Sequence, residues 1–353
     1  MRRFHLAVCL TLMILFSAFA ASAQSFVLDL PRQSQHAVIT QRLGITDITV
    51  NYHRPLINGR KVWDGLVPYG KVWRAGANEN TTIKFSSPVT IDGKALDAGT
   101  YGLHMIPTAD SWTVIFSKNY TSWGSFTYDE KEDALRVQVK PQPSDMHEAL
   151  TYDIDIPKDD SAVVTLRWEK LAVPFTVAVN VNEVVDASLQ KQLRGLAQYT
   201  WMSWDDAANF LLTAKTNYPE ALKYSDLSIQ NEDRFENELT KSKVLTAMGQ
   251  KDQSAVAQKK ALNLANPLQV HLYARGLQAE KRNDEAFAIF KENAQKHPDQ
   301  WFVHSGLARI YCSQGKYDDA AKEMKIALSG APENQKVYVD GLVKKLENRQ
   351  DIN

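Results

Sequence analysis

The chain has 353 residues with 41 basic and 41 acidic side chains, so its net charge is close to zero. Such a balance lacks the basic footprint that bulk nucleic-acid binding requires. The length is typical of about two domains. Of the two cysteines, Cys9 lies in a segment that we expect to be removed, which leaves Cys312 without an intramolecular disulfide partner.

Residues 1–23 have the pattern of a secretory signal peptide. Arg2 and Arg3 form a positive start, Leu6–Phe19 is an apolar run, and small residues occupy positions 21–23. The apolar run is shorter than the roughly 20 residues of a spanning helix. We therefore expect a periplasmic or secreted protein with no membrane span after signal removal. The alternative is an N-terminal membrane anchor.

Residues 25–182 show the alternation of β-strands. Apolar Ile48, Val50 and Tyr52, for example, are separated by polar residues. This period places one face of each strand in a core and the other face outward. The pair Asp92-Gly93 predicts a hairpin turn. We predict an antiparallel β-sandwich of roughly ten strands.

Residues 186–348 have a helical period with an internal repeat. Ala286 and Ala320 lie 34 residues apart, as do Pro298 and Pro332. This pattern resembles the tetratricopeptide repeat, in which small and large residues alternate at that period. We expect about four helical hairpins in a short α-helical solenoid that binds a protein partner. The alternative is a stabilising appendage of the β-domain.

The segment from Tyr52 to Thr82 lies between predicted strands and has no strand or helix period. Connections of this length are usually functional or disordered. Its aromatic content argues against disorder, since disordered segments are poor in aromatics. The repeated Lys-Val-Trp at Trp63 and Trp73 suggests two anchors. We predict an ordered, cationic cap on the β-domain.

Three sequence blocks of the β-domain are distinctive. They are GLVPYGKVWRAGAN at 65–78, AGTYGLHMIP at 98–107 and WTVIF at 112–116. Together they resemble the DUF2911 family, a domain of exported bacterial proteins. The resemblance covers roughly residues 31–180. It implies an exported domain of unknown function, sometimes followed by helical repeats, and it names no catalytic residue.

The cap and the nearby turns hold the candidate ligand-binding side chains. Arginine's planar fork suits carboxylate or phosphate groups, and exposed aromatic rings can stack on sugars. The alternative is structural: the arginines bond to loop carbonyls and to carboxylates such as Asp64, and the aromatics anchor the loop. The candidates are Arg54, Arg60, Trp73, Arg74, Asn78, Glu79, His104 and Trp123.

Three classes of function remain open. The favoured class is a non-catalytic adaptor of the cell envelope, without a cofactor, whose repeats bind a protein and whose β-domain binds a small anionic or sugar ligand or a second partner. An envelope hydrolase of sugar or peptidoglycan would need two carboxylates, and Asp64 and Glu79 are the acids of the cap. A metal-binding module would use His53 and His104, which the strand period places on outward faces.

Overall fold

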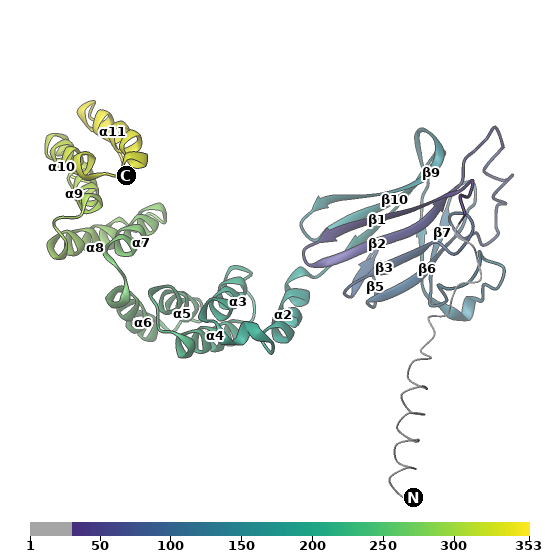
Figure 1. The fold of residues 1–353 in the computed structure, drawn as a ribbon, viewed down its shortest axis with the longest axis horizontal. Helices are drawn as coiled ribbons and strands as arrows, with labels where there is room; N and C mark the ends of the chain where they lie inside the picture. Colours follow the sequence, from purple (N-terminus) through teal and green to yellow (C-terminus); the bar gives the residue numbers. More distant parts are fainter. Residues whose placement is uncertain (1–29) are drawn as a thin grey trace, which may run out of the picture. The chain divides into compact units, whose positions relative to one another are not determined.

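The structure, a computed structural model, describes residues 30–353. The chain divides into two compact units, one ending at Val184 and the other starting at Val185. We call them the β-domain and the helical unit (Figure 1). The predicted signal peptide lies outside the described residues. Between residues 30 and 353, the helices are all too short or too polar to cross a bilayer.

The β-domain consists of two antiparallel sheets, so the predicted sandwich is confirmed. The six-stranded sheet has the order β1-β2-β3-β6-β7-β8, and the four-stranded sheet has the order β5-β4-β10-β9. The strands are β1 Gln35–Leu43, β2 Thr46–Arg54, β3 Thr82–Phe85, β4 Val89–Ile91, β5 Lys94–Leu96, β6 Gly99–Ile106, β7 Trp112–Ser117, β8 Asp133–Val139, β9 Gln142–Lys158 and β10 Ser161–Ala178.

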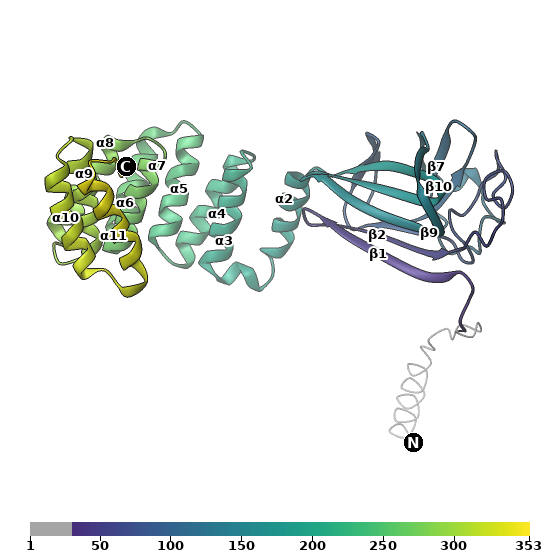
Figure 2. The same cartoon turned by 90° about the horizontal axis from the view of Figure 1, so that it is seen from above.

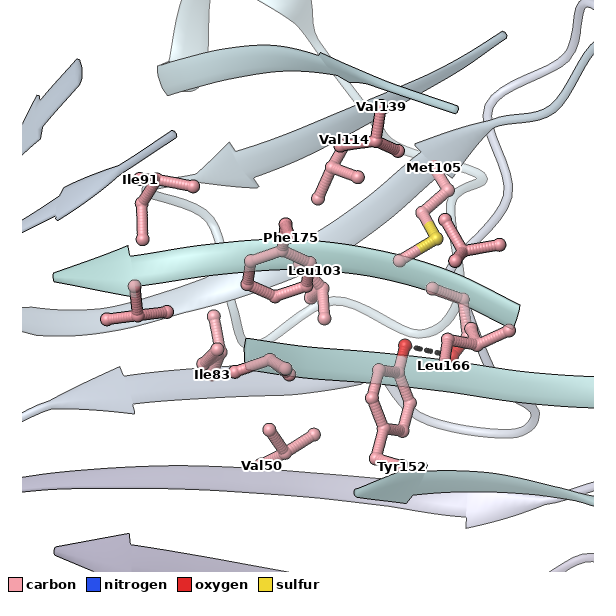
Figure 3. Packing of buried hydrophobic residues seen from close by; sticks show 14 of the residues in the cluster. Val50, Ile83, Ile91, Leu103, Met105, Val114, Val139, Tyr152, Leu166 and Phe175 are labelled. Carbon is pink, nitrogen blue, oxygen red and sulfur yellow. Dashed lines mark hydrogen bonds between the residues drawn. The ribbon is translucent and has the colours of Figure 1, made fainter. Parts of the chain in front are cut away.

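The core lies between the sheets and follows the alternation of the sequence. On β2, Val50 and Tyr52 are buried while Asn51 is exposed. From the other sheet, Leu166 and Phe175 of β10 are buried in the same cluster (Figure 3). Burial of each such side chain stabilises the fold by about 1.5–3 kcal/mol. The period of two therefore fixes which face of each strand joins the core.

The turn at Asp92-Gly93 is the predicted hairpin. Ile91 pairs with Lys94 across it, and the two turn residues have φ of 45° and 81°. Positive φ at both positions defines the type I′ turn, which matches the twist of the flanking strands. The hairpin β4–β5 thereby forms one edge of the four-stranded sheet.

Strand β10 is continuous but irregular. It contains both Leu166 and Phe175. Between them the register with β9 shifts at Glu169, whose φ is +54°. This irregularity bends the strand and disturbs the alternation of its buried and exposed residues.

In the helical unit, α2 is followed by four antiparallel helix pairs, as the repeat predicts, and by a last helix (Figure 2). Ala221, Ala286 and Ala320 are completely buried where the paired helices approach closely. The helices are α2 Val181–Gln192, α3 Trp201–Thr213, α4 Tyr218–Asn231, α5 Phe235–Ala247, α6 Lys251–Leu264, α7 Pro267–Ala279, α8 Asn283–Lys296, α9 Trp301–Ser313, α10 Tyr317–Gly330 and α11 Glu333–Glu347.

Helix α2 begins earlier than the sequence suggests. The helical period of the sequence begins at residue 186, but the helix starts at Val181. The side-chain oxygen of Asn180 accepts a hydrogen bond from the backbone N–H of Glu183 at 3.4 Å, which is the role of an N-cap. The predicted β-domain extends to residue 182, but Val181 is helical and packs on the core of the β-domain.

The apolar core of the helical unit is interrupted between α6 and α7. One cluster ends at Val244 of α5, and the next begins with Tyr273 and Ala274 of α7. Helices α6 and α7 scarcely touch, in contrast to α4 and α5 or α8 and α9. Because a solenoid is held together by contacts between neighbouring repeats, this seam is weaker than the junctions between α4 and α5 and between α8 and α9.

Candidate functional site

The Tyr52–Thr82 segment is held to the β-domain by its tryptophans. Trp63 and Trp73 meet edge to face with ring centroids 6.0 Å apart, and Trp63 also lies 4.8 Å from Trp112. The backbone of Trp73 exchanges two hydrogen bonds of 2.8 Å with Met105. Such aromatic contacts each add about 0.5–1.5 kcal/mol. Trp73 therefore anchors the segment and does not face a ligand cavity.

Two of the candidate arginines are structural. Arg54 donates from Nε to the carbonyl of Leu150 at 3.0 Å and from Nη2 to the hydroxyl of Thr151 at 2.9 Å. Arg60 donates from Nε to the carbonyl of Ile57 at 2.9 Å. The structure therefore gives these two arginines the role of satisfying backbone groups in an ordered loop.

Arg74 has different surroundings. Its side chain is half-buried, and its Nε lacks a hydrogen-bond acceptor. Among residues 30–353, no carboxylate lies within 4 Å of its guanidinium. Gly124 lies against this side chain: a Cβ at that position would be 2.7 Å from Nη1 of Arg74, and its φ of +67° favours glycine. Burial lowers the pKa of Arg74, which is the mark of a cation without a counter-charge.

His104 lies on the outer face of β6, as the strand period predicts, but it is buried. Its Nδ1 is 2.9 Å from the hydroxyl of Ser125, and its ring packs 5.3 Å from that of Tyr128. Both neighbours belong to the segment that follows β7 and covers this face. Burial lowers the pKa of His104 to about 4, although the charge of Asp133 opposes the shift. The imidazole is therefore neutral at pH 7.

A cavity of about 650 Å³ opens beside this region on β1 and β2. Glu79 lies in its wall, 2.7 Å from Nη1 of Arg32 and 3.5 Å from Nδ1 of His53. We call it the histidine cavity, and it is lined by Leu30, Pro31, Arg32, Ser34, Gln35, His36, His53 and Glu79.

The two histidines of this cavity come from paired strands. His36 lies directly opposite His53, with their rings 5.2 Å apart, and His36 Nε2 is 2.7 Å from the amide oxygen of Asn51. Burial lowers the pKa of His53 more than Glu79 raises it. For Glu79, burial acts to raise the pKa, but hydrogen bonds from its own backbone and from Arg32 lower it on balance.

We call this group of side chains the outer-face site. The guanidinium of Arg32, in the wall of the histidine cavity, lies 5.5 Å above the half-exposed ring of Trp123. The next residue, Gly124, lies against Arg74, and His104 is buried. Asn78 donates to the carbonyl of Ser34 at 3.3 Å and so holds the cavity wall. The site consists of Arg32, His36, His53, Arg74, Glu79, His104 and Trp123.

Arg32 and His36 are the members that the sequence reasoning missed. Both lie outside the Tyr52–Thr82 segment, and β1 does not show a clear alternation of apolar residues. The register of β1 with β2 brings His36 to His53. If a hairpin between Leu43 and Thr46 is assumed from the sequence, the register that follows from it places His36 opposite His53.

The structure does not bring together the residues that the hydrolase and metal hypotheses require. Asp64 lies 3.9 Å from Lys61 on the exposed loop and does not line the cavity that contains Glu79. His53 pairs with His36, while His104 bonds to Ser125, so the predicted histidine pair is not formed. In the part of the chain that the structure describes, no three metal-ligating side chains converge.

A second cavity, of about 580 Å³, occupies the seam of the helical unit. Several contacts bridge it. Gln258 donates to the hydroxyl of Tyr273 at 2.8 Å, Gln269 donates to the carboxylate of Glu236 at 2.7 Å, and the rings of Phe235 and Tyr273 meet at 6.4 Å. We call it the seam cavity, and its walls include Phe235, Leu239, Lys243, Gln258, Leu272, Tyr273 and Leu277.

Comparisons with known proteins agree with the order of the two units. Residues 34–177 match the family model described as "Protein of unknown function (DUF2911)". Residues 277–346 match a model described as "Tetratricopeptide repeat". No curated protein matches the chain. The predicted resemblances are therefore both confirmed, and the repeat match indicates protein–protein interaction.

Proposed function

We propose that this chain, a DUF2911 domain followed by tetratricopeptide repeats, is a non-catalytic adaptor of the cell envelope. Its helical unit binds a protein partner, and its β-domain binds a small anionic ligand. The repeat match supports the first part, because repeats of this kind stack into extended binding surfaces. The main observation that supports a protein partner is the seam cavity between α5, α6 and α7.

The seam cavity has the character of a protein-binding surface. Leu272 in its wall leaves 59 % of its surface exposed, and Leu268 on the same helix leaves 44 %. Exposed apolar groups beside polar ones are typical of interaction sites. The polar side chains of Gln258 and Lys243 surround them. A partner segment with apolar side chains would cover leucines that the weak α6–α7 junction leaves open.

Site-specific photocrosslinking tests this assignment. A photoreactive amino acid at Leu272 should crosslink a discrete protein in the native envelope. The same amino acid at Val256 is the matched control, because Val256 is exposed by 71 % on α6 but does not line the cavity. Equal products from both positions, or none from Leu272, would contradict a partner site in the seam.

The outer-face site supports the second part of the proposal. Arg74 is a half-buried cation without a carboxylate within 4 Å in residues 30–353, whereas Arg32 already has Glu79. An uncompensated buried charge is costly, and a bound carboxylate or phosphate would relieve that cost. Trp123 lies half-exposed beside it and could stack on a sugar ring of the ligand.

Thermal-shift and calorimetric titrations with inorganic phosphate and with glucuronate test the anion site. The protein should bind one of the two, and Arg74→Gln should lose that binding. The substitution should leave the melting temperature nearly unchanged, because it removes a charge that has no protein partner. Arg60→Gln is the control, since Arg60 bonds to loop carbonyls outside the site. Intact binding by Arg74→Gln would refute the assignment.

Localisation in the periplasm or outside the cell is part of the same proposal. It is supported by the signal-peptide pattern of residues 1–23. N-terminal sequencing of the protein from fractionated cells should begin near Gln24. A cytoplasmic protein that retains Met1 would be incompatible with an envelope adaptor.

A further inference from the structure

Strand β1 lies at one edge of the six-stranded sheet, where its neighbour is β2. Among residues 30–353, neither a second strand nor an isolated bridge joins its other side. In an antiparallel pair, about half of the N–H and C=O groups of each strand point away from the partner. Over the nine residues of β1, these outward groups can therefore pair with a further strand.

The other three edge strands of the two sheets are short or partly covered. Strand β5 has only three residues, and the carbonyl of Arg136 at the centre of β8 accepts a bond of 3.2 Å from Lys94. In the middle of β9, the carbonyl of Glu148 accepts a bond of 2.9 Å from the N–H of Ile57. Natural sheets protect their edges in such ways, and β1 shows none of them.

The burial of β1 is also incomplete. Ala37 and Ile39 face the core and pack on it, but both are only partly buried. Their partners on β2, Tyr52 and Val50, are almost fully buried. On the outer face of β1, Val38 leaves 54 % of its surface exposed. A further strand beside β1 would cover these apolar side chains on both faces.

The sequence of β1 is nearly symmetric about Val38. Residues 35–41 read QHAVITQ and contain no lysine, arginine, acid or proline. If two copies pair antiparallel with Val38 at the centre, Val38 faces its own counterpart. The facing pairs on either side are Ala37 with Ile39, His36 with Thr40 and Gln35 with Gln41.

This symmetry favours a second copy over a foreign strand. In each facing pair of β1, apolar residues face apolar residues and polar residues face polar ones. The same operation on β8 would place Arg136 opposite Arg136, and like charges directly opposite each other are destabilising. The edge of β1 is thus complementary to itself, as a two-fold interface requires.

We propose that a second copy of this chain occupies the edge of β1, and that the two β1 strands pair antiparallel about Val38. The pairing joins two six-stranded sheets into one and closes as a dimer, because the contact is isologous. It places Gln41 and Arg42 of the second copy opposite Gln35 and Ser34, which line the histidine cavity. Each copy thereby borders the cavity of the other. The dimer goes beyond the proposed function and does not depend on it.

Sedimentation velocity of the mature chain, without residues 1–23, tests the association. A single strand pair forms a small interface, and interfaces below about 1,200 Å² are typically weak. We therefore expect a monomer–dimer equilibrium between about 1 and 500 µM.

A charge at the symmetry axis tests the position of the contact. Val38→Lys sets two like charges opposite each other and should weaken association by about tenfold or more. Met146→Lys is the matched control, because Met146 is exposed by 57 % on the edge strand β9. It should leave the equilibrium unchanged.

Disulfide crosslinking tests the register. Directly opposite Cα atoms of antiparallel strands lie about 4.5–5.5 Å apart, which a disulfide can span. Val38→Cys should therefore form a linked dimer when the mature chain is treated with diamide. Thr40→Cys is the control, because its two copies would lie about 14 Å apart in this register. Cys312 is buried, so the wild-type chain should remain unlinked.

Three results would overturn the inference. One is a chain that stays monomeric throughout, with no more linked dimer from Val38→Cys than from Thr40→Cys. Another is a dimer that Val38→Lys leaves intact, since its contact would lie elsewhere. The last is a Val38→Cys chain that links to a different protein in the native envelope and not to its own copy. These readouts involve β1 and not the seam cavity, so failure here and failure of the proposed function are distinguishable.

Discussion

The hydroxyl of Tyr152 gives a sharp test of how the Tyr52–Thr82 segment is fixed. It donates to the carbonyl of Ala75 at 2.9 Å. The same carbonyl accepts a second bond from Thr81 Oγ1 at 3.2 Å. Ala75 is fully buried and has φ of +50°, so water cannot replace either donor and the strained backbone depends on both.

The expected loss in the free energy of unfolding depends on how many donors still bond to the carbonyl of Ala75. Tyr152→Phe removes one bond and leaves the carbonyl satisfied by Thr81, so the free energy of unfolding should fall by about 1 kcal/mol. Thr81→Val should cost a similar amount. The double variant leaves a buried carbonyl without a donor, and its loss should exceed the sum of the single losses by about 1 kcal/mol or more.

Urea unfolding of residues 25–184, followed by tryptophan fluorescence, measures these differences. The probes are well placed, because Trp63, Trp112 and Trp168 form one cluster in the core. Tyr120→Phe in the same fragment is the control, since Tyr120 is 45 % exposed. Strictly additive losses, or a double variant as stable as the wild type, would refute the reasoning.

Two further predictions concern helix packing and acid sensitivity. Gly306→Ala should lower the free energy of unfolding by about 1–3 kcal/mol, and with it the melting temperature, because the new Cβ would lie 2.8 Å from Cδ1 of Phe290. Gly341→Ala should raise the free energy of unfolding by about 0.5–1 kcal/mol, because no atom lies within 4 Å of the new Cβ. The pKa of His104 and of His271 is lowered by burial to about 4, below the unfolded value of about 6.5. The unfolded chain therefore binds more protons below pH 6.5, and stability should fall as the pH drops from about 6.5 towards 4. Gln at either position should reduce that fall in melting temperature between pH 7 and pH 5; an unchanged pH profile would contradict the assigned burial.

Much of the fold was predictable because it depends on local periods. The alternation at Val50 and Tyr52 and the type I′ turn at Asp92-Gly93 each have a direct physical cause in the strand or turn that they predict. The 34-residue repeat of Ala286 and Ala320 likewise predicted the paired helices. These features survive in the structure because packing and local preference agree.

The candidate site was less predictable because it is assembled from separate strands. Arg54 and Arg74 look alike in the sequence, yet Arg54 is satisfied by Leu150 and Thr151 while Arg74 has no such partner. The difference arises from β9 and from the segment around Gly124, which lie far away along the chain. The seam between α6 and α7 is also invisible to a repeat period, since each of these helices has an ordinary sequence.

Capture of partners from the native cell envelope tests the central claim most directly. The baits are the mature chain, residues 25–184 alone and residues 185–353 alone, compared by quantitative mass spectrometry after crosslinking. We expect the mature chain and residues 185–353 to enrich the same protein, and residues 25–184 not to enrich it. Enrichment of that protein by residues 25–184 alone, or of no protein by any bait, would contradict the claim that the helical unit recruits a partner.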